Sequence, residues 1–342
     1  MNTAAHPDAF FHAIDALATT SPEYRGGLTD HAAMAVEALA RLDPAAIDPF
    51  VARYYPRLRP MAAEPDVALQ PFPALVARER AALDRDGVAA TLAAHAATTL
   101  STGVVGAAFH GILRVAHAAR ALDRGDHPVL RDELARGLAY ATLRAEHLPP
   151  LPPRADRDGD LTLDEALAAL PPADDALVDA PGLITGTLLA RAASHPTLGE
   201  IRARLRLDDD PLRAASALRR AAVRLLTDGE QHPGSLFTIL HGVTGMDAVC
   251  GLVPLLPRDA AGALVDAAGG ALLAVRVAYI GRLGANPVTE PADDFTGLRA
   301  RAVRSLDEHA IKLAAALDEA ERERRDPHHA AALARWLDRI AA

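Results

Sequence analysis

Apolar residues recur at spacings of three and four along nearly the whole chain, and the strict alternation of half-buried strands is almost absent. This pattern predicts helices, with Pro and Gly marking the breaks between them. The first expected helix covers residues 7–18, and the second begins at Thr29 or Asp30. The others cover residues 45–58, 73–85, 88–99, 104–123, 128–146, 161–170, 183–193, 197–206, 211–227, 233–241, 245–255, 259–283, 304–323 and 327–340. No fixed-period repeat is visible, so we expect one all-α helical bundle domain spanning residues 1–342.

The sequence pattern changes between residues 147 and 181, where Pro pairs and acidic residues replace the helical periodicity. We interpret this stretch as a Pro-rich lid or surface excursion with one short helix, and not as a domain boundary. Residues 156–167 partly resemble a calcium-binding loop. However, such a loop has Gly at its sixth position and Glu at its twelfth, where this chain has Leu161 and Leu167. A polar loop with a helix cap is therefore favoured.

Composition narrows the possible functions. Half of the 342 residues are apolar and only 4% are aromatic, which is typical of a helical protein. The formal charge of −9 argues against a nucleic-acid or anionic-membrane surface. Cys250 is alone, and the N-terminal residues lack the pattern of a signal peptide. No uninterrupted apolar run of about 18 residues is present. We expect a cytoplasmic protein that binds neither membrane nor nucleic acid.

Among the 36 basic residues there is a single lysine, Lys312, which follows His309 by three residues. On a helix this spacing places both side chains on one face. Burial lowers the pKa of an amine, and a neutral lysine can take up carbon dioxide to give an anionic carbamate, which Arg cannot do. The alternative is a lone lysine on a solvated helix face.

Four of the fourteen histidines lie in small or apolar helical surroundings, far apart in the sequence: His31, His110, His241 and His309. Such a distribution is what a metal site inside a helix bundle requires, although a single histidine of this kind is more often a satisfied core residue. His241 precedes Gly242, which predicts that a helix ends there. No dinucleotide-binding glycine motif follows a strand, and the zinc-protease motif is absent.

These histidines lie in four motifs that resemble, in the same order, the questin oxidase-like family. The motifs are Gly26-Gly-Leu-Thr-Asp-His-Ala-Ala-Met34, Gly106-Ala-Ala-Phe-His-Gly-Ile-Leu-Arg114, Leu236-Phe-Thr-Ile-Leu-His-Gly-Val-Thr-Gly245 and Glu308-His-Ala-Ile-Lys-Leu313. That family usually has Asn-His-Ala-Pro-Met where this chain has residues 30–34, and often an aromatic residue where His117 stands. Its members in fungal polyketide pathways open anthraquinone rings oxidatively, in a reaction described either as Baeyer–Villiger-type oxidation or as dioxygenation. One branch consists of non-haem iron dioxygenases.

The resemblance implies an Fe(II) ion held by four histidines and a carboxylated lysine, which correspond here to His31, His110, His241, His309 and Lys312. Imidazole suits iron, and one anionic oxygen ligand resembles the carboxylate of other non-haem iron oxygenases. Five such ligands leave one coordination position. Because the sequence shows no flavin or nicotinamide site, a metal is the cofactor that an oxygen-activating version of this protein would use.

We therefore expect an iron-dependent oxygenase that uses O2 to cleave a C–C bond in a small aromatic, polyketide-type substrate. Arg114 and His117 follow His110 on its helix face and would line the pocket or orient ligands. Asp30 and Glu308 would fix imidazole tautomers. Two alternatives remain open: a zinc hydrolase that uses the same residues, and a helical scaffold whose histidines are structural.

Overall fold

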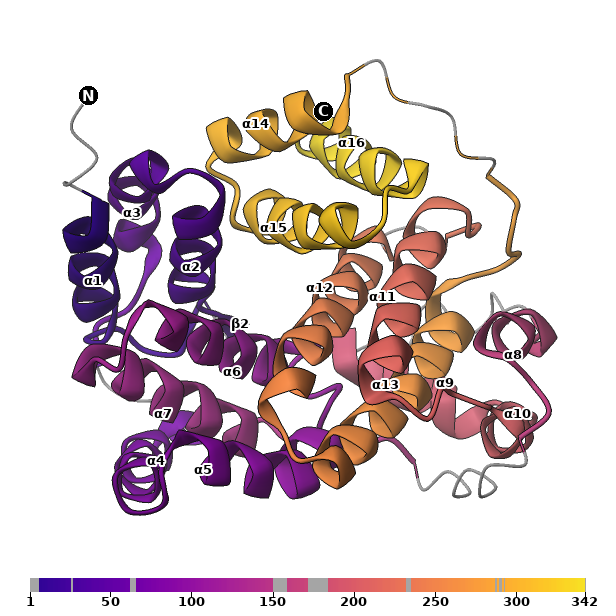
Figure 1. The fold of residues 1–342 in the computed structure, drawn as a ribbon, viewed down its shortest axis with the longest axis horizontal. Coiled ribbons are helices and arrows are strands. Elements are labelled where there is room, and N and C mark those ends of the chain that lie inside the picture. The colour runs from indigo at the N-terminus through magenta and orange to yellow at the C-terminus, as the bar shows by residue number, and fades with distance from the viewer. Residues whose placement is uncertain are drawn as a thin grey trace.

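The computed structural model describes residues 6–25, 27–61, 66–149, 159–171, 184–231, 235–286, 288, 291 and 293–341. These residues form sixteen α-helices and one short hairpin, so the prediction of an all-α fold is confirmed (Figure 1). The helices of the first half are α1 (His6–Leu17), α2 (Ala32–Leu42), α3 (Ile47–Tyr54), α4 (Phe72–Asp86), α5 (Val88–His95), α6 (His110–Ala121) and α7 (Pro128–Leu143). Strands β1 (Glu23–Tyr24) and β2 (Leu28–Thr29) pair antiparallel ahead of α2.

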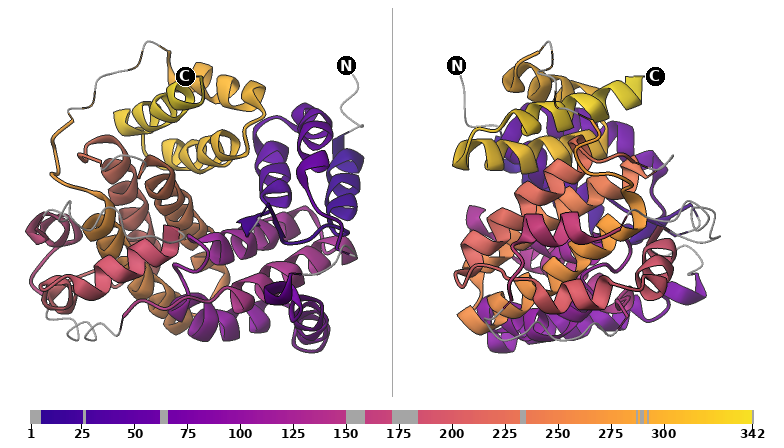
Figure 2. Two further views of the ribbon diagram at one scale, coloured as in Figure 1. Left: turned by 180° about the vertical axis from the view of Figure 1, so that it is seen from behind. Right: turned by 90° about the vertical axis from the view of Figure 1, so that its right-hand side faces the viewer.

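The second half is also helical. Its elements are α8 (Leu163–Ala169), α9 (Ile184–Ser194), α10 (Leu198–Arg204), α11 (Pro211–Thr227), α12 (Leu236–Leu252), α13 (Arg258–Tyr279), α14 (Phe295–Ser305), α15 (Glu308–Glu323) and α16 (Pro327–Ala341). Figure 1 shows α2, α6, α12 and α15 arranged around the middle of the molecule, and the views in Figure 2 show the C-terminal helices crossing one end of it. Helix α2 packs on α6 and α15, and α12 packs on the same two helices.

Two large clusters of buried apolar residues hold this arrangement together. The larger runs through α6, α7, α11, α12 and α13 and includes buried residues of α15 and α16. The second joins α1, α2 and α3 to Ile311 and Ala315 of α15. Burial of apolar side chains is the main favourable term in folding, so α15 is fixed from both sides. The four helices that carry the candidate histidines or directly follow them are therefore positioned by the core of the protein.

Two helical stretches, Leu236–Leu255 and Arg258–Tyr279, are long and apolar enough to cross a membrane, which the sequence pattern did not suggest. Within the fold, 83% and 72% of their apolar windows are buried against the rest of the chain. A core helix of this kind has the same length and composition as a membrane span. Their apolar character is accounted for by packing inside this protein.

The structure differs from the sequence-based expectation in three segments. Helix α12 continues through Gly242 and Gly245, so His241 lies inside a helix and does not end one. The stretch ahead of His110 is a turn, and α6 begins only at His110. Helix α14 was not expected. It ends at Leu306, whose backbone is left-handed, and the Asp307 side chain then caps a separate helix α15.

Most of the predicted excursion at 147–181 lies outside the described residues, which here are 147–149 and 159–171. The short helix expected at 161–170 is confirmed as α8. Its N-terminus is a capping box in which the side chains of Thr162 and Glu165 each accept a hydrogen bond from the other residue's backbone N–H. Asp160, one of the carboxylates in the calcium-like loop, pairs with Arg204 at 2.6 Å. This carboxylate is thus engaged by a cation from α10.

Candidate metal centre

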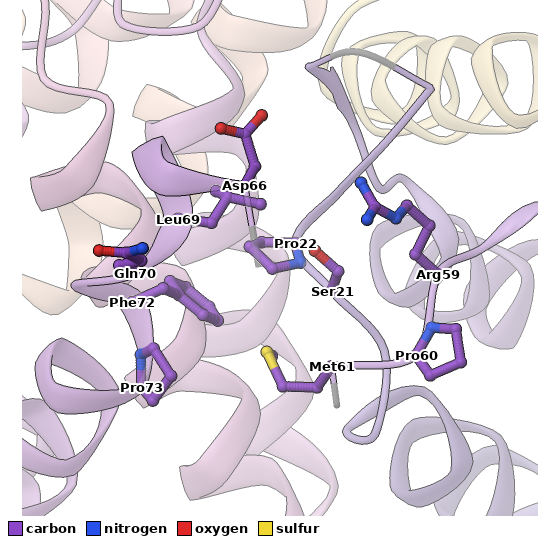
Figure 3. A pocket seen from close by; sticks show the side chains of 10 residues that line it. All are labelled: Ser21, Pro22, Arg59, Pro60, Met61, Asp66, Leu69, Gln70, Phe72 and Pro73. Atoms are coloured by element: carbon purple, nitrogen blue, oxygen red, sulfur yellow. The ribbon is translucent and has the colours of Figure 1, made fainter. Parts of the chain in front are cut away.

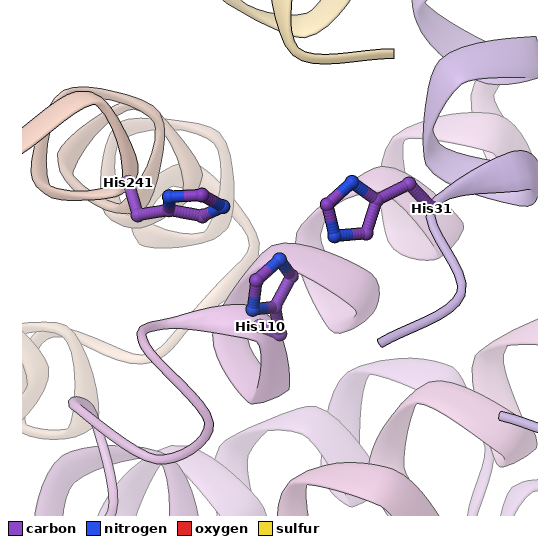
Figure 4. Close-up of side chains that lie close together, drawn as sticks. All are labelled: His31, His110 and His241. Atoms are coloured by element: carbon purple, nitrogen blue, oxygen red, sulfur yellow. The ribbon is translucent and has the colours of Figure 1, made fainter. Parts of the chain in front are cut away.

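The four histidines that the sequence singled out come together in the interior. His31 lies at the N-terminal boundary of α2, His110 is the first residue of α6, His241 lies within α12, and His309 lies in the first turn of α15. Figure 4 shows the rings of His31, His110 and His241 pointing toward one another from three separate segments. All four side chains are buried, with exposed fractions of 7% or less.

Distances between the rings are those of a compact cluster. The ring centroid of His31 is 4.5 Å from that of His110 and 4.6 Å from that of His309, and His241 is 4.6 Å from His110. One possible ligand atom from each of His31, His110 and His241 lies within 4.8 Å of the others, and the same holds for His31, His309 and Glu308. The cluster can therefore hold a metal ion.

The hydrogen bonds of the rings define which nitrogen is available. The Nδ1 atom of His110 donates to the carbonyl oxygen of Ala107, and Nδ1 of His241 donates to that of Phe237 at 2.7 Å. With the proton on Nδ1, the Nε2 atom carries a lone pair, which is the form of imidazole that binds metals. The Nε2 atoms of His110, His241 and His309 are buried and have no hydrogen-bond partner. Three buried ring nitrogens without a protein partner in one cluster fit the donor set of a metal ion.

Electrostatics keep the rings neutral. Burial lowers the pKa of His31, His110 and His309 well below 6.5, and nearby positive charge on Lys312 adds to the effect. Burial, followed by the charge of Lys312, lowers the pKa of His241 to about 3. A neutral imidazole can bind a cation at neutral pH without first losing a proton.

Lys312 lies on α15 one turn after His309, is 1% exposed, and has its Nζ atom 3.2 Å from Nδ1 of His31. It is therefore not the solvated surface lysine of the alternative interpretation. Burial lowers its pKa from 10.5 to about 8. At pH 7 about a tenth of such amines is uncharged, and the uncharged amine is the form that reacts with carbon dioxide.

The backbone immediately before His110 is strained. Ala107, Ala108 and Phe109 all have positive φ, at 46°, 55° and 69°, a region that costs a non-Gly residue about 1–2 kcal/mol. The amide of Ala107 donates to the Glu146 carboxylate, and that of Ala108 to the Thr185 hydroxyl, each at 2.8 Å.

Two glycines leave room for this turn. A Cβ on Gly106 would lie 2.3 Å from the Arg144 carbonyl oxygen, and one on Gly245 would lie 2.8 Å from the Phe109 ring.

Because Gly adopts positive φ without this penalty, we expect Ala108→Gly to stabilise the metal-free protein by about 1 kcal/mol. Urea-induced unfolding monitored by circular dichroism measures the change. The matched control is Ala81→Gly, at an exposed position inside α4, which we expect to destabilise by about 1 kcal/mol. Loss of stability in Ala108→Gly similar to that of the control would show that the left-handed turn carries no strain.

The pH dependence of stability follows from the lowered pKa of His241. An unfolded histidine takes up a proton near pH 6.5, whereas the buried ring does so only near pH 3, so acid favours the unfolded state. Stability from this residue is complete above pH 6.5 and falls by about 1.4 kcal/mol per pH unit below about pH 6, down to pH 3. Urea unfolding of the metal-free protein between pH 7 and pH 5 measures the slope. His241→Phe removes this contribution, and an identical slope in the variant would contradict the assignment.

The remaining predicted site residues lie beside the cluster with partners of their own. The Arg114 guanidinium is 2% exposed and donates to Glu133 at 3.1 Å, and Nδ1 of His117 lies 2.6 Å from the Glu37 carboxylate. Asp30 accepts hydrogen bonds from the Ala32 amide and the Thr20 hydroxyl, and no bond to an imidazole is found among the described residues. Glu308 lies nearer to a ring, with Oε1 3.9 Å from Nδ1 of His309.

Two hollows lie in the half of the protein that carries His31 and His110. A cavity of about 10 Å³, room for one water molecule, is lined by Arg114, His117, Glu37 and Glu133 among others. A larger pocket of about 150 Å³ opens near the hairpin (Figure 3). Its lining residues are Ser21, Pro22, Arg59, Pro60, Met61, Asp66, Leu69, Gln70, Phe72 and Pro73. None of the five candidate ligands lines either hollow.

Sequence reasoning missed the aromatic residues that cover one side of the cluster. The Phe237 ring centroid lies 4.5 Å from His241 and 4.8 Å from His309, and Trp336 of α16 lies 5.7 Å from His309. The spacing of Phe237 and His241, one helical turn apart, is a signal that the sequence contained. Trp336 comes from a distant helix, and the sequence offers no comparable signal for it.

No protein-family model and no curated protein sequence matches this chain.

Proposed function

We propose that this protein is a mononuclear non-haem iron oxygenase that uses O2 to cleave a C–C bond in an aromatic, polyketide-type substrate. One observation carries the proposal: histidines from four segments, 31 to 309 in the sequence, converge with three buried Nε2 atoms that have no partner. Three imidazole nitrogens gathered in one buried cluster form the kind of donor set that a metal ion in a helix bundle requires. The proposed reaction rests in addition on the resemblance of the four motifs to the questin oxidase-like family.

The residues present fit the ligand set that the resemblance implies. His31, His110, His241 and His309 would hold the ion through neutral nitrogens. Lys312 would add an anionic oxygen donor after its amine combines with carbon dioxide, which forms a C–N bond and releases one proton. An iron ion so held supplies redox chemistry with O2. Starting from the protonated lysine, two protons leave in total, one to give the neutral amine and one on formation of the carbamate, so a positive charge in the cluster is replaced by a negative one.

The surroundings of the cluster support chemistry in a dry site. The five candidate ligands are between 0% and 7% exposed, and the rings of Phe237 and Trp336 lie against His241 and His309. Exclusion of water strengthens electrostatic interactions and protects reactive species from side reactions. The rings of Phe237 and Trp336 could also contact the ring of an aromatic substrate, and such contacts would favour its binding.

Metal analysis of the purified protein, combined with O2 consumption in the presence of hydroxylated aromatic polyketides, tests the proposal. We expect about one iron per chain and substrate-dependent uptake of O2. Zinc without O2 uptake would instead favour a hydrolase that uses the same carboxylated lysine, and a folded protein without bound metal after loading would favour a helical scaffold.

A substitution of His117 tests whether the proposed ligand set is limited to the cluster residues. It follows His110 by seven residues on α6, which at 1.5 Å per residue places it about 10.5 Å further along the helix axis, and its ring is paired with Glu37. We expect His117→Phe to retain the metal and to change substrate turnover. Iron content and O2 uptake of the variant measure the two effects, and loss of the metal would show that the assigned ligand set is wrong.

A further inference from the structure

Glu308 is the one described carboxylate within reach of two of the candidate imidazoles. A carboxylate oxygen of Glu308 lies within 4.8 Å of ligand nitrogens of both His31 and His309. The neighbouring Asp307 is occupied as the helix cap, since its carboxylate accepts from the amides of His309 and Ala310 and from the Trp336 indole. Glu308 is 6% exposed, so its carboxylate is buried.

The partner of Glu308 is Arg57, and the pairing is long. The two guanidinium nitrogens lie 3.3 Å and 3.4 Å from the carboxylate oxygens, whereas ionic hydrogen bonds of this type are usually about 2.7–2.9 Å. Arg57 also interacts with two tyrosines. Its guanidinium lies 4.6 Å from the centre of the Tyr54 ring and donates to the Tyr24 hydroxyl at 3.3 Å. Glu308 could therefore exchange this partner without leaving Arg57 unsupported.

Arg57 also connects the cluster to solvent. Its side chain is 35% exposed, while the candidate ligands are exposed by 7% or less. A divalent cation that approaches from this side meets Arg57 first, Glu308 next, and then His309. The carboxylates of Asp307 and Asp30 also act on the charge of Lys312, but Asp307 caps α15 and Asp30 accepts hydrogen bonds from the Ala32 amide and the Thr20 hydroxyl.

From these contacts we propose that Glu308, together with His31 and His309, forms a second metal-ligating position at the edge of the histidine cluster, and that Arg57 competes with the metal ion for its carboxylate. The proposal rests on the metal centre of the proposed function and adds an anionic ligand that does not depend on carbon dioxide. In the absence of bicarbonate, Glu308 supplies the negative charge that first captures the ion.

The test uses the metal-free full-length chain titrated with Co²⁺ in buffer freed of carbon dioxide, and again with added bicarbonate. The single tryptophan, Trp336, lies against His309, so its fluorescence should report the binding of a quenching ion, and the Co²⁺ absorption bands give a second readout. We expect Glu308→Gln to weaken Co²⁺ binding at least about 10-fold without bicarbonate, and less with it. We expect Arg57→Met to strengthen binding about threefold or more under the same conditions.

If Glu308→Gln weakens Co²⁺ binding and Arg57→Met strengthens it, Glu308 acts as a metal ligand. In a structural clamp, the ion pair between these residues would only hold the fold together. A clamp predicts that both variants lower stability and weaken Co²⁺ binding together, and that result would overturn the proposal. Arg53→Met is the matched control, because this neighbouring exposed arginine contacts the Ser305 carbonyl and should leave Co²⁺ affinity unchanged. If Glu308→Gln does not fold, tighter binding by Arg57→Met still supports the proposal, and unchanged or weaker binding contradicts it. Wild-type protein that binds no Co²⁺ would instead remove the metal centre itself.

Discussion

Replacement of Lys312 by Arg should abolish iron loading at the four-histidine centre and every activity that depends on that iron. The variant keeps a positive charge and a similar length, but a guanidinium does not deprotonate and cannot be carboxylated. It would hold a permanent cation beside His31, which Nζ of the native lysine approaches to 3.2 Å. We expect less than about a tenth of the wild-type iron content and no detectable O2 uptake. Metal analysis and circular dichroism of the variant measure loading and folding separately.

Two further measurements isolate the role of the carbamate. Lys312→Glu restores an anionic oxygen on a shorter side chain and should recover part of the iron without the full activity. In the wild-type protein, loading should rise with added bicarbonate, and with pH through about 8, where the buried amine loses its proton. A folded Lys312→Arg variant with normal iron content would show that Lys312 is not a ligand.

Replacing any one of His31, His110, His241 and His309 by Ala should lower iron affinity by more than about 100-fold while leaving a folded helical protein. Loss of a group that only supports a ligand typically costs about 10–100-fold, and loss of the ligand itself should cost more. Isothermal titration with Fe²⁺ under nitrogen measures the affinity. Stability of the metal-free variants should change far less, because three of the four rings have a buried nitrogen that makes no hydrogen bond.

His329→Ala is the matched control for this series. His329 is also buried, at 2% exposure, but its Nδ1 atom is satisfied by the Glu321 carboxylate at 2.8 Å. We expect this variant to lose stability and keep its iron affinity. Four well-folded variants of the cluster histidines with wild-type affinity would contradict the proposed ligand set.

Most of the helices follow from the apolar periodicity, and two of the three failures, in α12 and ahead of α6, share one cause. The sequence of α12 contains Gly242 and Gly245, which by local propensity suggest a break, yet Gly245 is required because the Phe109 ring packs where its Cβ would be. Residues 104–109 fit a helical pattern, but Gly106 approaches Arg144 closely, and the backbone amides of the next two residues bond to Glu146 and Thr185, where residues 107–109 are left-handed. Contacts between distant segments override local preference in each case.

Part of the candidate site could be predicted from the sequence, and part of it depends on contacts between distant segments. The residue type and apolar setting of the four histidines, and the single lysine, are visible in the sequence, so their convergence could be anticipated. The partners of the surrounding residues could not. Pairing of Arg57 with Glu308 joins residues 251 positions apart, and pairing of His117 with Glu37 joins residues 80 apart. Such pairs are determined by the packing of α2 on α6 and by the position of the segment that follows α3 beside α15.

Crystals of the protein as purified, measured with X-rays at the iron absorption edge, test the central claim most directly. The account predicts one anomalous peak within bonding distance of the Nε2 atoms of His110, His241 and His309, with electron density for a carboxylate continuous with Nζ of Lys312. An iron peak elsewhere, or an occupied cluster beside a bare Lys312 ammonium, would contradict it.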